Sequence, residues 1–286
     1  NYDGENLTIV TGSAAYDNKN VGTGKTVAFT GFALAGDAAA NYKLIAQPTD
    51  TTADITVKEI TISGAAVEAS RIYDGTTDAK ITNAGAPSVN YDGENLKVAT
   101  GKAAYDNKNV GKGKAVTFTG FALEGDAAAN YKLTAQPEAV TADITVKEIK
   151  IVDTAVEASK VYDGSTDAKI TEKGTFDGLI DGDKVDIVTG KAAYDDKNVG
   201  NGKTVAFCEF ALSGDDAANY VLSAQPASTT ASISANELTI SDLKVKDKQY
   251  DGKNTAEIDG TPALVGVVDG DVLTLINGVP TFDSVK

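Results

Sequence analysis

The side chains best placed for chemistry are oxygen-bearing residues that recur in five short loops. Aspartate and asparagine gather there, and Ca²⁺ takes six to eight oxygen ligands, often with several carboxylates. Three of the loops also carry a lysine, and the negative charge of each loop is small, so Asx turns are the simpler interpretation. Calcium is the alternative, which a thermal shift on adding the ion would favour. The loops are Asp17–Asn20, Asp106–Asn109, Asp195–Asn198, Asp181–Asp183 and Asp269–Asp271.

A glycine-rich run from Gly22 to Thr26 resembles the end of a phosphate-binding loop. Such a loop needs another glycine five positions before its Gly-Lys pair, where backbone N–H groups cradle the phosphate. Lysine stands there in this run and in its two copies, at Lys19, Lys108 and Lys197. In the second copy Ala115 replaces the hydroxyl residue that would bind magnesium. We therefore expect a glycine-rich hairpin turn and no nucleotide site.

The composition removes most hydrolytic chemistry. The 286 residues include no histidine, so there is no imidazole base, no Ser-His or Cys-His pair and no His-ligated zinc. Acidic pairs could imitate a glycosidase, which needs two carboxylates across a cleft. Acids that recur in every repeat are more simply solvated surface. We expect no enzyme activity and no catalytic, cofactor-binding or metal-ligating residues.

Charge and cysteine content narrow the partners. The formal net charge is −15 and the lysines are dispersed among the acids, whereas nucleic acids and anionic membranes bind basic patches. Neither is expected as a partner, and no apolar run approaches the ~20 residues that span a bilayer.

The lone Cys208 has the opposite parity to the apolar residues before it, so we expect it to face away from the core. Intermolecular pairing is the alternative. An isopeptide crosslink from Lys108 to an asparagine would appear as a loss of ammonia from the intact mass.

Internal repetition is the main feature of the sequence. A Tyr-Asp-Gly triplet recurs at Tyr73, Tyr162 and Tyr250, with spacings of 89 and 88 residues, and two other tyrosine series keep a spacing of 89. We expect the tyrosine of this triplet to be a buried ring that is followed by a turn. This period is too long for a solenoid and fits an array of small domains with separate cores. The predicted organisation is the C-terminal part of a repeat over 1–62, complete repeats over 63–151 and 152–240, and the N-terminal part of a repeat over 241–286.

Within a repeat, apolar residues alternate with the period of two that is typical of half-buried strands. Val116 and Phe118 share one face, but Phe121 has the other parity. An extra residue at Thr119–Gly120 would restore the inward face, so we expect a β-bulge there. The third repeat has Glu209 in place of this glycine, from which we expect a bulge without a left-handed residue.

Six or seven short strands per repeat predict an all-β fold of tandem small β-sandwich domains. The alanine-rich Asp126–Asn130 leads into Tyr131, an arrangement similar to the tyrosine corner of immunoglobulin-like domains. A β-grasp-like unit is the alternative, but this segment is short for the helix of that fold. Consecutive repeats join at Lys58–Glu59 and Lys147–Glu148 without a Gly/Ser linker, so we expect stiff joints and an elongated array.

Three linked motifs resemble the YDG-type repeats of large bacterial surface adhesins, including filamentous-haemagglutinin-like proteins. They are Ile72–Thr77, Tyr105–Gly111 and Gly125–Tyr131, and the resemblance covers nearly the whole chain. It implies an exported protein at the bacterial cell surface with a stalk or adhesive role. It brings no catalytic residue to this sequence.

Three functions fit this reading. The first is a non-catalytic extracellular stalk that holds a binding domain away from the cell. The second is an array that binds host glycans or glycoproteins by avidity, which charge disfavours: residues 63–151 carry ten basic and eleven acidic side chains, whereas 152–240 carry seven and fifteen. The third is a filament in which neighbouring copies complete each other's partial repeats.

Overall fold

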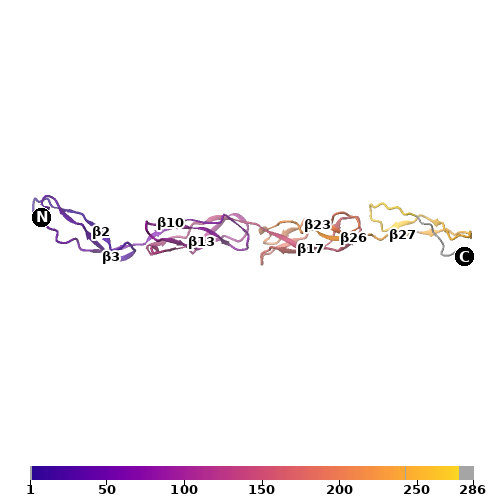
Figure 1. The fold of residues 1–286 in the computed structure, drawn as a ribbon, viewed down its shortest axis with the longest axis horizontal. Helices are drawn as coiled ribbons and strands as arrows, with labels where there is room; N and C mark the ends of the chain where they lie inside the picture. Colours follow the sequence, from indigo (N-terminus) through magenta and orange to yellow (C-terminus); the bar gives the residue numbers. More distant parts are fainter. Residues whose placement is uncertain (1, 242, 277–286) are drawn as a thin grey trace. The chain divides into compact units, whose positions relative to one another are not determined.

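The structure, a computed structural model, describes residues 2–241 and 243–276 (Figure 1). Contacts divide the chain into two compact units, residues 1–145 and 146–286, and each unit is described by itself. We call residues 2–55 the first segment, 58–145 the second repeat, 147–234 the third repeat and 236–276 the last segment. Nearly all regular structure is strand, which confirms the all-β prediction.

The described part of the first unit contains sixteen strands, β1 to β16, and two short 3₁₀ turns, η1 and η2. Their bounds are β1 Thr8–Val10, β2 Ser13–Tyr16, β3 Gly22–Thr30, β4 Ala33–Ala35, η1 Ala39–Asn41, β5 Thr51–Ile55, β6 Lys58–Ile60, β7 Ile62–Val67, β8 Ser70–Ile72, β9 Asp78–Ala79, β10 Ile81–Pro87, β11 Lys97–Ala99, β12 Lys102–Tyr105, β13 Gly111–Thr119, β14 Ala122–Glu124, η2 Ala128–Asn130, β15 Tyr131–Leu133 and β16 Val140–Thr145.

The second unit contains fourteen described strands, β17 to β30, and the 3₁₀ turn η3. Their bounds are β17 Lys147–Val156, β18 Ser159–Val161, β19 Asp167–Ala168, β20 Ile170–Asp177, β21 Asp186–Val188, β22 Lys191–Tyr194, β23 Gly200–Cys208, β24 Ala211–Ser213, η3 Ala217–Asn219, β25 Tyr220–Leu222, β26 Thr229–Ser234, β27 Thr239–Ser241, β28 Lys244–Val245, β29 Ile258–Asp259 and β30 Ala263–Val265.

Each complete repeat is built of two layers. In the third repeat one layer is the five-stranded sheet β18-β26-β23-β22-β19, in which β23 and β26 lie side by side (Figure 1). The other layer holds β20-β17-β25 and the pair β21-β24. Ile151 and Ile187 from the second layer share one buried cluster with Val205, Phe207 and Ile233 from the first. A single core between two sheets is the arrangement of a sandwich. The second repeat has the same five-stranded order, β8-β16-β13-β12-β9.

The described residues contain no α-helix, which removes the β-grasp-like alternative. The alanine-rich segment forms only the 3₁₀ turn η2, and the equivalent segments form η1 and η3. Among the described residues, no helix has the length and apolar character that a membrane span requires.

The parity switch near residue 120 has a different cause from the one predicted. β13 pairs in the five-stranded sheet, whereas β14 pairs with β11 in the other layer, so the chain crosses between layers instead of forming a bulge. Gly120 makes this crossing with φ +71°, and Glu209 adopts φ +61° at the same place. The expectation that no left-handed residue is needed was therefore wrong. The crossing brings Phe118 and Phe121 together edge to face, with ring centroids 5.6 Å apart.

The glycine-rich run also differs from the prediction. Gly22 and Lys25 lie inside the continuous strand β3, and the register with β5 shifts between them, so the run is a bulge within a strand and not a hairpin turn. Gly24 has φ +61° there, which only glycine adopts without strain. Cys208 lies at the end of β23 and is exposed, as its parity predicted.

Candidate functional site

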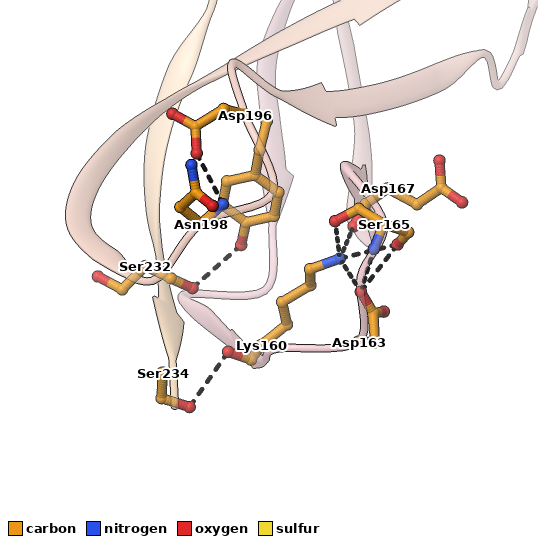
Figure 2. A network of polar contacts seen from close by, with 9 residues as sticks. Lys160, Asp163, Ser165, Asp167, Asp196, Asn198, Ser232 and Ser234 are labelled. Atoms are coloured by element: carbon orange, nitrogen blue, oxygen red, sulfur yellow. Dashed lines mark hydrogen bonds and ion pairs between the residues drawn. The ribbon is translucent and has the colours of Figure 1, made fainter. Parts of the chain in front are cut away.

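The Tyr-Asp-Gly turn is closed by a basic side chain three residues before its aspartate. In the third repeat, Asp163 Oδ1 accepts hydrogen bonds from Lys160 Nζ at 2.8 Å and from both the backbone N–H and the hydroxyl of Ser165 at 2.9 Å (Figure 2). Lys160 Nζ also donates to the backbone oxygens of Ser165 and Asp167, each at 3.0 Å. The ammonium therefore sits at the centre of the turn. Its hydrogen bond, together with the one from the backbone N–H of Ser165, lowers the pKa of Asp163 to about 2.

The same turn recurs with different basic residues. Arg71 forms an ion pair with Asp74 in the second repeat, and Lys248 bonds to Asp251 at 2.9 Å in the last segment. The basic group also lies over the ring of a tyrosine from another strand of the same five-stranded sheet, at 5.1 Å for Arg71 of β8 and Tyr105 of β12. In the third repeat Lys160 of β18 lies over the ring of Tyr194 of β22, at 5.6 Å. A cation over an aromatic face is attracted by the ring's quadrupole, so this residue joins the turn to the sheet.

The tyrosine of the triplet was predicted to be a buried ring. That is confirmed for Tyr73, of which 1% is exposed, whereas Tyr162 is half-buried. Tyr250 is 82% exposed, so the prediction was wrong in the last segment. Among the described residues, the last segment has no counterpart of the strands that cover this ring in a complete repeat. This accounts for the exposure of Tyr250.

The acidic loops are occupied by a lysine of the chain itself. Lys114 Nζ lies 2.9 Å from Asp106 Oδ1 and 2.8 Å from Asn107 Oδ1, and its side chain is nearly buried. This ion pair lowers the pKa of Asp106 below its ordinary value. The same lysine in the other two loops is Lys25 and Lys203. This lysine comes from the glycine-rich run that resembles the end of a phosphate-binding loop. The glycine-rich run and the acidic loop therefore belong to one structural element.

The loops keep the Asx turns that the sequence predicted. The backbone N–H of Asn109 bonds to Asn107 Oδ1 at 3.0 Å, and that of Asn198 bonds to Asp196 Oδ1 at 2.7 Å. Among the described residues, no group of three or more His, Cys, Asp or Glu side chains could hold a metal ion. Lys108, considered for an isopeptide bond, has its ammonium 5.9 Å from the centre of the Tyr73 ring.

A second turn is closed by a tyrosine hydroxyl. Tyr220, at the start of β25, donates to Asp183 Oδ2 at 2.6 Å, and its oxygen accepts the backbone N–H of Ile180 at 3.2 Å. In the second repeat Tyr131 donates to Glu94. Burial of this ring, together with the adjacent carboxylate, raises the pKa of Tyr131 to about 12. The predicted tyrosine corner is thus present in a modified form, because its hydroxyl bonds to a carboxylate of an upstream turn.

This second turn forms a joint inside the first unit, where the first segment meets the second repeat. Lys19 Nζ lies 3.0 Å from Glu94 Oε1. Asn130 Oδ1 accepts the backbone N–H of Val21 at 2.9 Å, and its amide nitrogen lies 3.1 Å from Asn20 Oδ1. The contacts border a shallow cavity of about 310 Å³. Only two residues, 56 and 57, separate β5 from β6 here.

A joint of the same kind lies inside the second unit, between the third repeat and the last segment. Lys197, the counterpart of Lys19, lies 3.8 Å from Asp271 Oδ1. Tyr162 donates its hydroxyl to the same carboxylate at 3.1 Å. The sequence predicts an Asx turn, or alternatively a calcium site, for the loop that contains Asp271, and it predicts no role for Asn130. The signal that could have identified that role is the asparagine before the tyrosine in every copy, at Asn41, Asn130 and Asn219.

These features define a class of protein: tandem two-layer β-repeats whose recurring turns are closed by internal ion pairs. The sequence model of the YDG domain matches residues 1–53, 56–139, 145–231 and 234–286, and the chain belongs to the YDG domain family. No curated protein and no solved structure matches the chain.

Proposed function

We propose that the chain is a non-catalytic spacer in the stalk of a bacterial cell-surface adhesin, where it works outside the cell. Membership of a repeat family over nearly the whole length supports this role. So do the joints, since a lysine of one repeat bonds to an acid of the next in both units. Short connections that carry their own ion pairs restrict bending between neighbouring repeats. A spacer needs this stiffness, which long flexible linkers would not give.

The observation that carries the proposal is how the strands at the two ends of a repeat are paired. In the third repeat β18, near the entry, pairs in parallel with β26, at the exit. In the second repeat β8 pairs in parallel with β16 in the same way. When the two ends of a repeat are pulled apart, parallel neighbours slide along each other. All hydrogen bonds between them then bear the force together, whereas antiparallel ends would open one bond at a time.

Stretching single molecules held by their two ends tests this role. We expect two large unfolding events, one for each complete repeat, each releasing about 300 Å of chain at ~3.4 Å per extended residue. Both events should occur at a higher force than the opening of the two partial segments. Gradual extension without discrete events would refute the mechanical role.

The variant Ser232→Pro offers an internal control. The backbone N–H of Ser232 donates to Ala158 O at 2.9 Å, so proline removes one bond between the entry and exit strands. We expect the unfolding force of the third repeat to fall while that of the second repeat is unchanged, because its own bond from Asp143 to Ala69 remains. Equal forces for the two repeats in this variant would contradict the assignment of these strands.

Binding of host glycans or glycoproteins by avidity stays a prediction. Saturable binding of the whole chain on a glycan array would favour it over a purely mechanical spacer.

A further inference from the structure

The Tyr-Asp-Gly turn of the third repeat touches the last segment at its glycine. A Cβ on Gly164 would lie 2.9 Å from Val268 Cγ1, which is closer than such atoms approach without one of them moving. Gly164 also has φ +80°, a left-handed backbone that favours glycine. Gly182 and Gly252 share this backbone, but a Cβ on either would meet no atom within 4 Å. Position 164 therefore needs a glycine for its neighbour as well as for its turn.

A polar contact lies beside this glycine. Tyr162, the first residue of the triplet, donates its hydroxyl to Asp271 Oδ1 at 3.1 Å. Lys197 Nζ lies 3.8 Å from the same oxygen. Tyr162 follows β18, whereas Lys197 lies between β22 and β23. Two separate loops of the third repeat thus meet at one carboxylate of the last segment.

The group that contacts these loops is itself a closed turn. The backbone N–H of Asp271 bonds to Val268 O at 3.1 Å, and Gly270 between them has φ +88°. One short turn therefore carries both the apolar side chain and the carboxylate that contact the third repeat. The pattern of an apolar residue or tyrosine, then Asp, Gly and an acid recurs at 2–5, 91–94, 180–183 and 268–271.

The turns with this pattern are alike in structure. The backbone N–H of Glu94 bonds to Tyr91 O at 3.1 Å, as that of Asp183 bonds to Ile180 O at 3.2 Å. In the first unit Glu94 receives Lys19 of the preceding segment, as Asp271 receives Lys197 in the second unit. The acid of this pattern is thus the contact point of the joint in both units.

The Tyr-Asp-Gly turn is held in shape by bonds within its own repeat. Asp163 Oδ1 accepts hydrogen bonds from Lys160 and from the backbone N–H and hydroxyl of Ser165 (Figure 2). None of these bonds involves the last segment. A site whose geometry is already fixed loses little conformational entropy when its partner binds.

We propose that the Tyr-Asp-Gly turn is a docking site for the apolar-Asp-Gly-acid turn of the repeat that follows it. Gly164 leaves room for the apolar side chain, and Tyr162 and Lys197 bind the carboxylate. The site thus selects a turn that presents an aliphatic group and an acid three residues apart. This inference rests on the proposed spacer role, because a joint of fixed direction matters in an extended array.

Double electron–electron resonance measures the joint in the whole chain. Spin labels at Glu172→Cys and Thr261→Cys, in a Cys208→Ser background, report the separation between the third repeat and the last segment, and both label positions are exposed. We expect a single narrow distance. A broad distribution of distances in this chain would overturn the proposal.

Two valine variants separate the neighbour from the turn. Gly164→Val should replace the narrow distance with a broad distribution, because its side chain takes the place of Val268. Gly252→Val is the matched control, since it puts the same side chain on a left-handed glycine of another Tyr-Asp-Gly triplet without a neighbour in reach. It should leave the distance unchanged, and equal effects of the two valines would contradict docking at Gly164.

A disulfide trap tests the contact itself. In the Cys208→Ser background, Gly164→Cys with Val268→Cys should close a disulfide within each chain under mild oxidation, since a disulfide needs Cβ atoms about 3.5–4.5 Å apart. Gly182→Cys with Val268→Cys is the control and should keep both thiols free, because a Cβ on Gly182 would meet no atom within 4 Å. Free thiols are counted by intact mass after alkylation. Equal thiol loss in both pairs, or none in either, would refute the docking.

Failure of docking can be told apart from failure of the spacer role. The unfolding force of each complete repeat depends on the pairing of β8 with β16 and of β18 with β26, which lie inside the repeats. A broad label distance together with two large unfolding events would therefore reject the docking site alone.

Discussion

The side chain of Gln136 takes the place of a neighbouring strand for Phe121, which lies where the chain crosses between the two layers. Its side-chain oxygen accepts the backbone N–H of Phe121 at 2.7 Å, and its amide nitrogen donates to Phe121 O at 3.0 Å. Phe121 is buried, so water cannot replace either bond. In Gln136→Ala both groups lose their partner, at a net cost of about 1 kcal/mol each. We expect the second repeat to lose about 2 kcal/mol of unfolding free energy.

Hydrogen–deuterium exchange with peptide-level mass spectrometry reads this loss in the whole chain, because each repeat reports its own opening. About 2 kcal/mol corresponds to roughly 30-fold faster exchange in peptides of the second repeat. Gln47→Ala is the matched control: the same two bonds join it to Phe32, but that residue is only half-buried and water can take the place of the side chain. Its effect should stay below about 1 kcal/mol. Equal effects at the two sites, or no effect at Gln136, would refute the reasoning.

Two further predictions concern the turns. Because the folded-state pKa of Asp163 is lowered to about 2, its contribution to stability is present above the ordinary aspartate pKa near 4 and is lost as the pH falls toward 2. The third repeat should therefore weaken over that window in acid titrations followed by exchange, and Asp163→Asn should flatten the change. Gly101→Ala should destabilise the second repeat far more than Gly120→Ala, because a Cβ on Gly101 would overlap the carbonyl oxygen of Thr119, whereas Gly120 only needs its left-handed φ, worth about 1 kcal/mol. Thermal melts that rank the two glycines in the opposite order would contradict this.

The all-β fold could be predicted because its signals are local. Alternation with period two and a turn residue every few positions define short strands without knowledge of their partners. The pairing could not be read in this way. The parallel contact of β8 with β16 joins residues more than 70 positions apart, such as Arg71 and Ile144, and alternation alone is compatible with many such pairings. The same limit applies to the layer crossing, since a change of parity fits a bulge as well as a change of sheet.

The turns were located from the sequence, but their chemistry was not. The oxygen atoms of the loop at 106–109 were correctly predicted to form Asx turns, and the only further partner considered for them was a calcium ion. The partner is Lys114, which lies seven residues beyond Asn107 across a bulge. Sequence spacing does not show this, because the bulge between Gly111 and Lys114 changes which way the lysine points. Asn130 was overlooked for a similar reason: its partners, Asn20 and Val21, belong to the preceding segment.

Some residues of the turns form one contact within their own repeat and another with the neighbouring segment. Folding of a repeat and ordering of its joint are therefore linked. Glu94 receives the hydroxyl of Tyr131 within its own repeat and the ammonium of Lys19 from the segment before it. Both contacts favour the ionised carboxylate, and they hold the pKa of Glu94 below its ordinary value. When this turn is formed, the Glu94 carboxylate is already oriented toward Lys19 of the first segment. Folding of the second repeat therefore also prepares the contact at its joint. At the two joints described within the units, the cation that faces the carboxylate is a lysine of the chain.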